Sequence, residues 1–260
     1  MLKDIKKIYE YREMLKNNVR KELRARYKGS VLGFFWTFLN PLLQLVVYSI
    51  VFSTVMKVKV PNYNYTIFLF VGLVPWNFLQ ASVQQSTTII TVNSNLIKKI
   101  YFPRVILPLT VTLTNLINML LTFIIVFIAL FAFGSHVSIW YIFLPVIIVV
   151  EGIFVLALTL FISSMTVYFR DLEHIIGIIL MAWTYLSPVI YPSEYIPSSV
   201  FKLFKMNPMF SVIESYRDVL MFNRQPDMLG LLYVFMLAVL LLAIGYVVFD
   251  RLQRRFAEEI

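Results

Sequence analysis

The sequence has no cysteine and very little charge. The absence of cysteine excludes disulfides and thiolate metal sites. Charged residues make up only 14% of the 260 residues, and hydrophobic residues make up 60%, whereas soluble domains carry about 25% charged residues. The apolar residues form runs of the length that a transmembrane helix requires. The composition therefore predicts an all-α membrane protein.

Common catalytic and nucleotide-binding motifs are also missing. The sequence holds no G-x-x-x-x-G-K-[ST] phosphate loop, no H-E-x-x-H pair and no G-x-S-x-G turn. Its two histidines, His136 and His174, show no metal-ligand spacing. We therefore predict no catalytic residue, no metal site and no cofactor in this chain. A net charge of +9 is more typical of membrane topology signals than of nucleic-acid binding, so we expect no nucleic-acid partner.

Six apolar runs predict six transmembrane helices in one membrane domain, residues 1–260. About 20 apolar residues cross a bilayer, and the predicted spans are 31–56, 66–90, 105–133, 140–169, 175–191 and 228–249. Spans 1–5 thus occupy 31–191, and 250–260 form a tail. The segments on the side of the termini carry 17 Lys and Arg, and the opposite side carries 6. The positive-inside rule then places both termini in the cytoplasm.

Residues 1–30 precede the first span and predict an amphipathic helix. They hold ten Lys or Arg and four Asp or Glu. An apolar stripe at helical spacing consists of Ile8, Tyr11, Leu15, Val19, Leu23 and Tyr27. A helix of this kind lies in the headgroup plane, and we favour that position over packing on a soluble partner because a span follows directly.

The loop 93–104 predicts a short helix between spans 2 and 3. Asn93, Ser94 or Asn95 can cap it, and Pro103 is expected to end it. Its apolar side would hold Leu96, Ile97 and Ile100, with Lys98 and Lys99 pointing outward. The residues alone favour an ordinary positively charged cytoplasmic loop over a helix that transmits movement from a partner protein.

The longest loop, 192–227, predicts two short helices on the external side. Pro197-Ser198-Ser199 can start the first. Asn207-Pro208 can cap the second, whose apolar face is Phe210, Ile213, Tyr216 and Leu220. Both are too short to span. They either dip back into the outer leaflet or pack on the spans as an external loop, and the residues do not decide between these two arrangements.

Two groups of ionisable residues interrupt the apolar runs. Arg170, Asp171, Glu173 and His174 predict a tight polar turn at the membrane surface over 170–174. Glu151 alone lies deep in a predicted span, about 17 Å from its start at 1.5 Å per residue. It is either a functional intramembrane acid or a structural group, protonated or hydrogen-bonded to Asn115, Asn118 or Gln84.

Aromatic residues make up 16% of the chain, and many stand at span ends, where an interfacial belt explains most of them. Trp36, Trp183, Tyr185 and Tyr191 are the candidates for a different role. They can line a path and stack on the C–H faces of sugar rings. Span 2 carries a polar face from Asn77 to Ser86 that must meet another helix, a wet cavity or the cytoplasmic end.

Three groups of residues, in this order and spacing, resemble the permease subunits of ABC-2 type polysaccharide exporters, and the likeness covers nearly the whole chain. The first is Arg26-Tyr27-Lys28-Gly29-Ser30-Val31-Leu32-Gly33 with Trp36 and Pro41. The second is Asn95-Leu96-Ile97-Lys98-Lys99 with Phe102-Pro103-Arg104 and Leu107-Pro108. The third is Tyr168-Phe169-Arg170-Asp171-Leu172 leading to Ser187-Pro188-Val189-Ile190-Tyr191.

The resemblance implies a function and its partners. It implies a homodimer of permeases in the bacterial plasma membrane, with two copies of a separate ATPase that binds ATP and Mg²⁺. The exported substrate would be a lipid-linked polysaccharide such as O-antigen, capsule or teichoic acid. Residues 1–27 would be an interface helix, 94–102 a coupling helix and 193–225 external gate helices. The residues implied for ATPase coupling are Asn95, Lys98, Lys99, Phe102, Arg104, Arg170 and Asp171.

Two other functions remain open at this point. An ABC-2 permease for a drug or small lipid would share the span count and the dependence on an ATPase. A membrane scaffold or an ion-coupled carrier would need no ATPase, and Glu151 is the only feature in the sequence that supports the carrier.

Overall fold

The computed structural model describes residues 7, 9–25, 29–30, 32–51, 64–134 and 138–260, and over these residues the chain is helical with no strand. Two residues of the predicted N-terminal stripe, Ile8 and Tyr27, and the end of predicted span 1, 52–56, lie outside this part. The longer helices are α2 (Arg12–Ala25), α3 (Trp36–Tyr48), α4 (Tyr65–Ser86), α7 (Ile106–Ala132), α8 (Leu144–Met165), α9 (Leu172–Tyr185), α11 (Pro208–Leu220) and α12 (Met228–Leu252). The short ones are α5 (Ile89–Val92), α6 (Ser94–Lys99), α10 (Phe201–Lys205), α13 (Phe256–Glu259) and the 3₁₀ turns η1 (Gly33–Phe35), η3 (Ile139–Phe143), η4 (Ser193–Tyr195) and η5 (Gln253–Arg255).

Polar caps mark where several of these helices begin. The side chain of Asn64 accepts a hydrogen bond from the Thr66 amide at 2.8 Å at the start of α4. Asp227 accepts from the amides of Leu229 and Gly230, both at 3.1 Å, at the start of α12. Each cap satisfies backbone donors that the first helical turn leaves unpaired. The helices therefore begin where a polar residue meets an apolar run.

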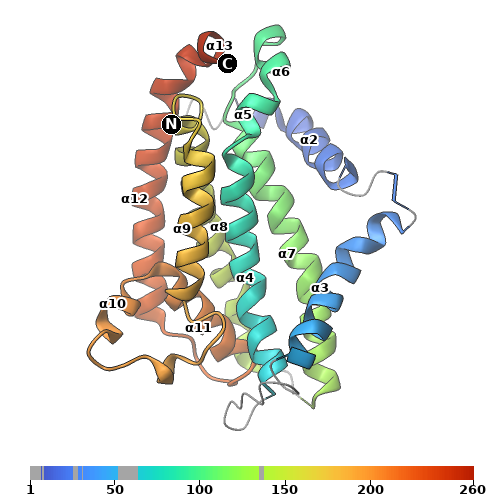
Figure 1. Cartoon of the computed structure of the whole chain (residues 1–260), viewed down its shortest axis with the longest axis vertical. Helices are drawn as coiled ribbons and strands as arrows, with labels where there is room; N and C mark the ends of the chain where they lie inside the picture. The colour runs from blue at the N-terminus through green and yellow to red at the C-terminus, as the bar shows by residue number, and fades with distance from the viewer. Residues whose placement is uncertain (1–6, 8, 26–28, 31, 52–63, 135–137) are drawn as a thin grey trace.

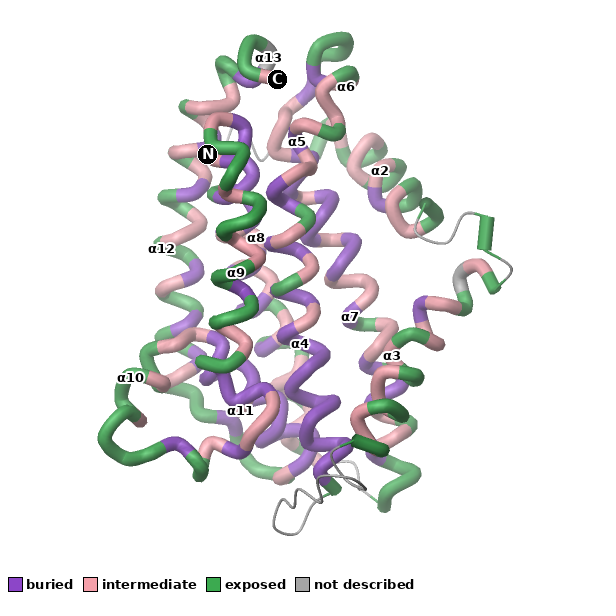
Figure 2. The backbone as a smooth tube through the Cα atoms, in the orientation of Figure 1, coloured by how far each residue is buried: buried purple, intermediate pink, exposed green. Residues whose placement is uncertain are grey.

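α4 is the centre of the bundle (Figure 1). It contacts α7, α8, α9 and α11, and Figure 2 shows it buried along nearly its whole length. Of the apolar window of α4, 83% is buried, against 22% in α12. Because lipid solvates apolar side chains as well as protein does, the outer helices keep apolar faces that no protein segment covers. This explains why α4 and α12 are both apolar although only α4 is inside.

α12 lies along α8, and Gly245 permits the close approach. A Cβ at this position would lie 3.0 Å from the carbonyl oxygen of Ala157 on α8. Small residues at such crossings let two backbones come together, which is how helices gain packing contacts inside a membrane.

Among the residues that the structure describes, four helical stretches are long and apolar enough to cross a membrane: Tyr65–Ser86, Ile106–Ala132, Ile139–Met165 and Met228–Arg255. They correspond to predicted spans 2, 3, 4 and 6. Trp36–Val51 and Leu172–Tyr185 are shorter apolar helices at the places of spans 1 and 5. At 1.5 Å per residue, α9 is about 21 Å long, which is less than the hydrocarbon thickness of about 30 Å.

The predicted bounds of span 5 and of the turn before it were wrong. The helix covers Leu172–Tyr185 and not 175–191. The chain turns at 166–171, and Glu173 and His174 belong to the first turn of α9. An acidic side chain in a first helical turn is favourable, because the helix dipole is positive there, so the charged residues do not have to stand in a loop.

The short helices, together with α2 and α11, lie at the two ends of the bundle (Figure 1). α2, α5, α6 and α13 lie at one end, called here the α6 end, and α10 and α11 lie at the other, called the α11 end. α2 packs on α7 with Val19 buried, while its charged residues stay exposed. Within the described residues, this confirms the amphipathic helix predicted from the N-terminal stripe.

Candidate functional site

The short helix expected in the 93–104 loop is present as α6. Ile97 is buried, and Lys98 and Lys99 are exposed in its last turn, as predicted. Three details of the prediction were wrong. The helix ends at Lys99, well before Pro103, and Ile100 is in extended backbone with its side chain 55% exposed. The side chain of Asn93 donates to the carbonyl oxygen of Ile89 at 2.8 Å, so it closes α5 and does not cap α6.

The C-terminal segment packs directly against α6. Phe256 is fully buried in an apolar cluster with Ile97 and Phe102. The Lys98 ammonium donates to the backbone carbonyl of Ile260 at 2.5 Å. α13 is thus part of the same surface as α6, although the sequence reading assigned no role to the tail. The available signal was Phe256 itself, a large apolar residue within a charged segment.

Contacts from the loop after α8 complete this surface. The Tyr168 hydroxyl donates to the carbonyl oxygen of Leu252 at 3.0 Å, and the Arg104 guanidinium lies 5.9 Å from the centre of the Phe256 ring. The same apolar cluster includes Leu160 of α8 and Phe249 of α12. A force on α6 therefore reaches two of the long helices through packed side chains.

The remaining residues implied for coupling divide into two groups. Asn95, Arg170 and Asp171 are exposed, and Arg104 is half-buried. Phe102 is only 5% exposed and faces the cluster, so it supports the surface from beneath. A cavity of about 730 Å³ opens between the α6 segment, the residues just before α2 and the end of α12. Its charged lining is Lys7, Glu10, Lys98, Lys99, Arg104, Asp250 and Arg254. Its excess of cations suits an acidic partner surface.

At the α11 end, Arg217 ties three segments together. Its side chain is 0% exposed. It donates to the carbonyl oxygens of Pro188 at 2.5 Å and Val189 at 2.9 Å, and it forms an ion pair with Glu214 at 2.9 Å. The guanidinium carbon lies 3.6 Å from the centre of the Phe68 ring of α4. Arg217 thereby clamps α11 and the segment after α9 onto α4.

A glycine on α4 makes room for this arginine. A Cβ on Gly72 would lie 2.6 Å from the Nη2 of Arg217 and 3.1 Å from the carbonyl oxygen of Val189. No real side chain fits at those distances, and the bonds of Arg217 prevent it from moving aside. Sequence reasoning missed this clamp because Arg217 stands in a loop counted only for its charge.

Glu151 has a partner that the sequence reading did not name. Its Oε2 accepts a hydrogen bond from the hydroxyl of Tyr216 on α11 at 2.7 Å, and both side chains are fully buried. The expected partners Asn115, Asn118 and Gln84 were wrong; the amide of Asn115 donates to Gln85 instead, at 3.1 Å. Glu151 therefore joins α8 to α11.

The helix pair predicted in 192–227 is present as α10 and α11. The side chain of Asn207 accepts from the Met209 amide at 3.0 Å, which confirms the predicted cap. The expected apolar face of Phe210, Ile213, Tyr216 and Leu220 is buried, so α11 packs into the bundle. Near its end, Asp218 pairs with Arg224 at 2.6 Å. Burial nevertheless raises the pKa of Asp218 to about 6, although the Arg224 guanidinium acts to lower it.

Three of the four candidate path aromatics lie near the end of α9. The indole nitrogen of Trp183 donates to Asn207 at 2.9 Å, and its ring packs edge-on against Trp76. Tyr185 is 64% exposed, and the Tyr191 hydroxyl donates to its carbonyl oxygen at 2.7 Å. Trp36 lies apart at the start of α3 and donates to the Ser30 hydroxyl at 2.8 Å.

The geometry is that of a bundle of apolar helices with the exposed basic helix α6 at one end and the buried helix α11 at the other. The family model described as ABC-2 type transporter matches residues 13–221. The chain belongs to this family. The match runs from α2 through α11, and so includes α6, Arg217 and Glu151.

Proteins similar to this ABC-2 chain align with more of its length than the family model does. The O-antigen export system permease protein RfbA of Myxococcus xanthus is 36% identical over 100% of both chains. A protein of the same name from Klebsiella pneumoniae is 34% identical over 92% of this chain and 91% of its own. The polysialic acid transport protein KpsM of Escherichia coli is 23% identical over 86% of this chain and 88% of its own.

Within the described residues of this ABC-2 chain, no three His, Asp or Glu side chains come close enough to hold a metal ion. The buried ionisable groups are instead bound to other side chains or to backbone carbonyls. The candidate site therefore consists of the α6 surface, the α11 clamp and the bundle between them.

Proposed function

We propose that this chain is the membrane-spanning permease of an ATP-driven exporter of lipid-linked polysaccharide in the bacterial plasma membrane. The observation that carries the proposal is the full-length similarity to a protein named as an O-antigen export permease. The similarity to a polysialic acid transport protein extends it to other polysaccharides. Both relatives favour a polymer over a drug or small lipid as the substrate.

The energy source lies on a partner. The sequence holds no phosphate loop, so a separate ATPase subunit binds ATP and Mg²⁺, two copies of it serving a homodimer of permeases. The exposed Asn95, Lys98, Lys99, Arg170 and Asp171 and the half-buried Arg104 meet the ATPase. The α6 end is then cytoplasmic, with both termini there, and α3 and α9 serve as spans 1 and 5 of a six-span chain that forms one domain.

Movement passes from the ATPase to the path through packed side chains. Closure of the ATPases on ATP pushes α6, and the cluster around Phe256 passes the displacement to α8 and α12. α10 and α11 act as the gate at the external end. The polymer crosses between the two permeases, where Trp36, Trp183, Tyr185 and Tyr191 offer aromatic faces to its sugar rings.

Affinity purification of the chain from its native membrane tests the partnership. We expect a complex of two permeases and two ATPases by intact mass. Lys99→Glu should abolish ATPase binding, because it places a like charge against the acidic surface that the lysine meets. Lys16→Glu, an exposed charge on α2, should leave the complex intact. A chain that exports polymer yet purifies without any ATPase would contradict the proposal.

The ion-coupled alternative depends on Glu151 and has its own test. Glu151→Gln keeps an oxygen that can accept the Tyr216 hydroxyl, so we expect wild-type export at every pH tested. Glu151→Leu leaves that hydroxyl buried without an acceptor and should lower stability by about 1–3 kcal/mol. If Glu151→Gln does not export polymer, or if its export depends on pH differently from that of the wild type, proton coupling would be favoured.

A further inference from the structure

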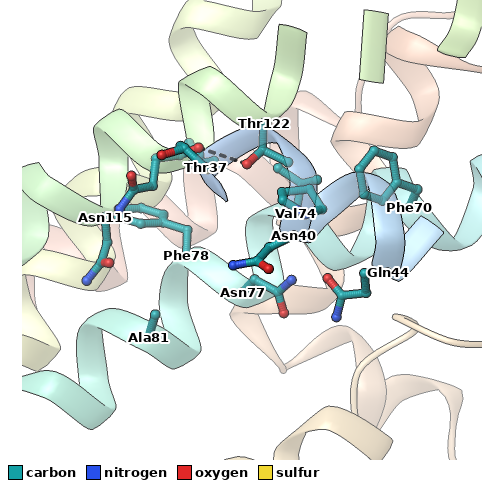
Figure 3. Close-up of a pocket in the computed structure, with 13 residues that line it drawn as sticks. Thr37, Asn40, Gln44, Phe70, Val74, Asn77, Phe78, Ala81, Asn115 and Thr122 are labelled. Carbon is teal, nitrogen blue, oxygen red and sulfur yellow. Dashed lines mark hydrogen bonds between the residues drawn. The ribbon is translucent and has the colours of Figure 1, made fainter. Parts of the chain in front are cut away.

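A cavity of about 220 Å³ lies between α3, α4 and α7 and is assigned to no step of the proposed mechanism (Figure 3). Asn77 lines it from α4. Asn77 is twelve residues from the start of that helix, which is about 18 Å at 1.5 Å per residue. The cavity therefore lies near the middle of a hydrocarbon core about 30 Å thick.

The lining is polar and carries no charge. Five carboxamides reach it, those of Asn40, Gln44, Asn77, Asn115 and Asn118, and none of its lining residues is Lys, Arg, Asp or Glu. Figure 3 shows the carboxamides of Asn40 and Asn77 pointing toward one another from α3 and α4. Polar side chains are costly at this depth and usually serve function or pair with one another.

Two of the lining side chains have no hydrogen-bond partner. Both polar atoms of the Asn118 carboxamide are buried and unpaired, and so is the hydroxyl of Thr37. Buried polar groups are almost always hydrogen-bonded. Thr112, six residues before Asn118 on α7, follows this rule: its hydroxyl is hydrogen-bonded to that of Thr159 on α8 at 3.0 Å. The unpaired groups at Asn118 and Thr37 therefore leave hydrogen-bonding capacity at the cavity that water or a ligand can use.

The chemistry of the lining selects that ligand. A carboxamide both donates and accepts, as a sugar hydroxyl does, and the rings of Phe70 and Phe78 line the same cavity and offer apolar faces to sugar C–H groups. Without a cation in the lining, a phosphate or carboxylate finds no counter-charge. The volume is below the 300 Å³ or so at which drug-sized pockets begin, so it suits one monosaccharide unit.

We propose that this cavity binds an uncharged sugar unit of the polymer during its passage through the membrane. Asn40 is exposed, so the cavity opens at the surface of the protomer beside α3, where a passing chain can enter it. The inference rests on the proposed function and adds a carboxamide subsite to the aromatic residues already assigned to the path.

Two variants with matched controls test the subsite in cells. Asn118→Leu and Asn40→Leu keep the side-chain size and remove the carboxamide that would bind the sugar. Each should lower the amount of polymer at the cell surface by about tenfold, the effect of one or two lost hydrogen bonds to the substrate. Thr112→Val removes a hydrogen bond of the same helix outside the cavity and should export normally. All variants are compared at equal amounts of permease and ATPase in the membrane.

A photo-crosslinking amino acid at position 40 gives an independent readout. We expect a crosslinked polymer ladder from position 40 in cells that make the polymer, and none from position 128, which faces outward on α7 with its Ile128 side chain 64% exposed. Normal export by both leucine variants, or export without a crosslink at position 40, would mean that the cavity holds only water. Absence of polymer export by the wild-type chain would instead refute the proposed function itself.

Discussion

Arg217 illustrates how single residues hold this membrane protein together. A buried charge without partners costs several kcal/mol of stability. The guanidinium of Arg217 has such partners: the backbone oxygens of Pro188 and Val189 and the carboxylate of Glu214. The same bonds prevent the arginine from moving. Positions that touch it are therefore intolerant of even one added carbon.

Gly72→Ala tests this clamp. The added Cβ would lie 2.6 Å from the Arg217 Nη2, so we expect a loss of about 1–3 kcal/mol, as for other overpacked interiors. Gly152→Ala on α8 is the control, because nothing lies within 4 Å of its Cβ, and alanine should be neutral or stabilising in a helix. Thermal unfolding of the purified protein in detergent measures both. Equal unfolding temperatures for the two variants would contradict the clamp.

Asp218 predicts a pH dependence at the α11 end. Its pKa is about 6 in the folded protein and about 3.9 when unfolded. Between these values the folded state holds the additional proton, so stability is present below this window and falls as pH rises through it. We expect the wild type to lose about 1–2 kcal/mol more than Asp218→Asn between pH 4 and 7, because solvent screens part of the shift. Parallel unfolding curves across that range would contradict the expectation.

At the scale of elements, α6 and α13 act as one surface. α6 has six residues and α13 has four, and neither length is stable alone in water. Ile97, Phe102 and Phe256 provide the shared apolar core that holds them. The coupling surface therefore depends on a segment about 160 residues away in sequence, as the bond from Lys98 to Ile260 shows.

Phe256→Ala should release α13 without unfolding the bundle. Replacing a buried Phe costs about 3–5 kcal/mol, which exceeds what the other contacts of so short a segment can supply. We expect residues 253–260 to lose hydrogen-exchange protection and polymer exported per ATP hydrolysed to fall. Glu258→Ala, an exposed residue of the same helix, is the control. Unchanged protection of the segment in Phe256→Ala would refute the shared surface.

At the scale of the whole molecule, the open question is how the bundle crosses the membrane. In the described part of the chain, four stretches are long enough to span, and α9 and Trp36–Val51 are shorter. If α9 also crosses, three spans (α7, α8 and α9) separate α6 from α10, which matches the positions of the two helices at opposite ends of the bundle (Figure 1). The distribution of Lys and Arg then predicts that the α6 end is cytoplasmic.

Single cysteines can test this orientation, because the chain has none of its own. Asn95 and Ser198 are both exposed, at the α6 end and next to α10. A membrane-impermeant thiol reagent applied to sealed right-side-out vesicles should label Ser198→Cys and should label Asn95→Cys only after the vesicles are opened. Wild-type protein should stay unlabelled. Labelling of Asn95→Cys in sealed vesicles would reverse the orientation.

The sequence alone determined the parts of this protein that follow from local chemistry. The long apolar runs predicted α4, α7, α8 and α12, since hydrocarbon admits only segments that satisfy their own backbone. The cap at Asn207, the exposed Lys98 and Lys99 and the apolar face of α11 also follow from neighbouring residues. The distinctive residues around Tyr168 and Ser187 indicated the family.

Only the tertiary structure decided which distant groups meet. Tyr216 as the partner of Glu151, Phe256 beneath α6, the clamp of Arg217 and the unpaired Asn118 join segments far apart in sequence. The end of α9 at Tyr185 also depended on contacts beyond its own residues. Hydropathy records how much each residue avoids water, and in a membrane that is the same whether it faces lipid or protein; the choice of neighbour is made by packing and hydrogen bonding, which act between helices.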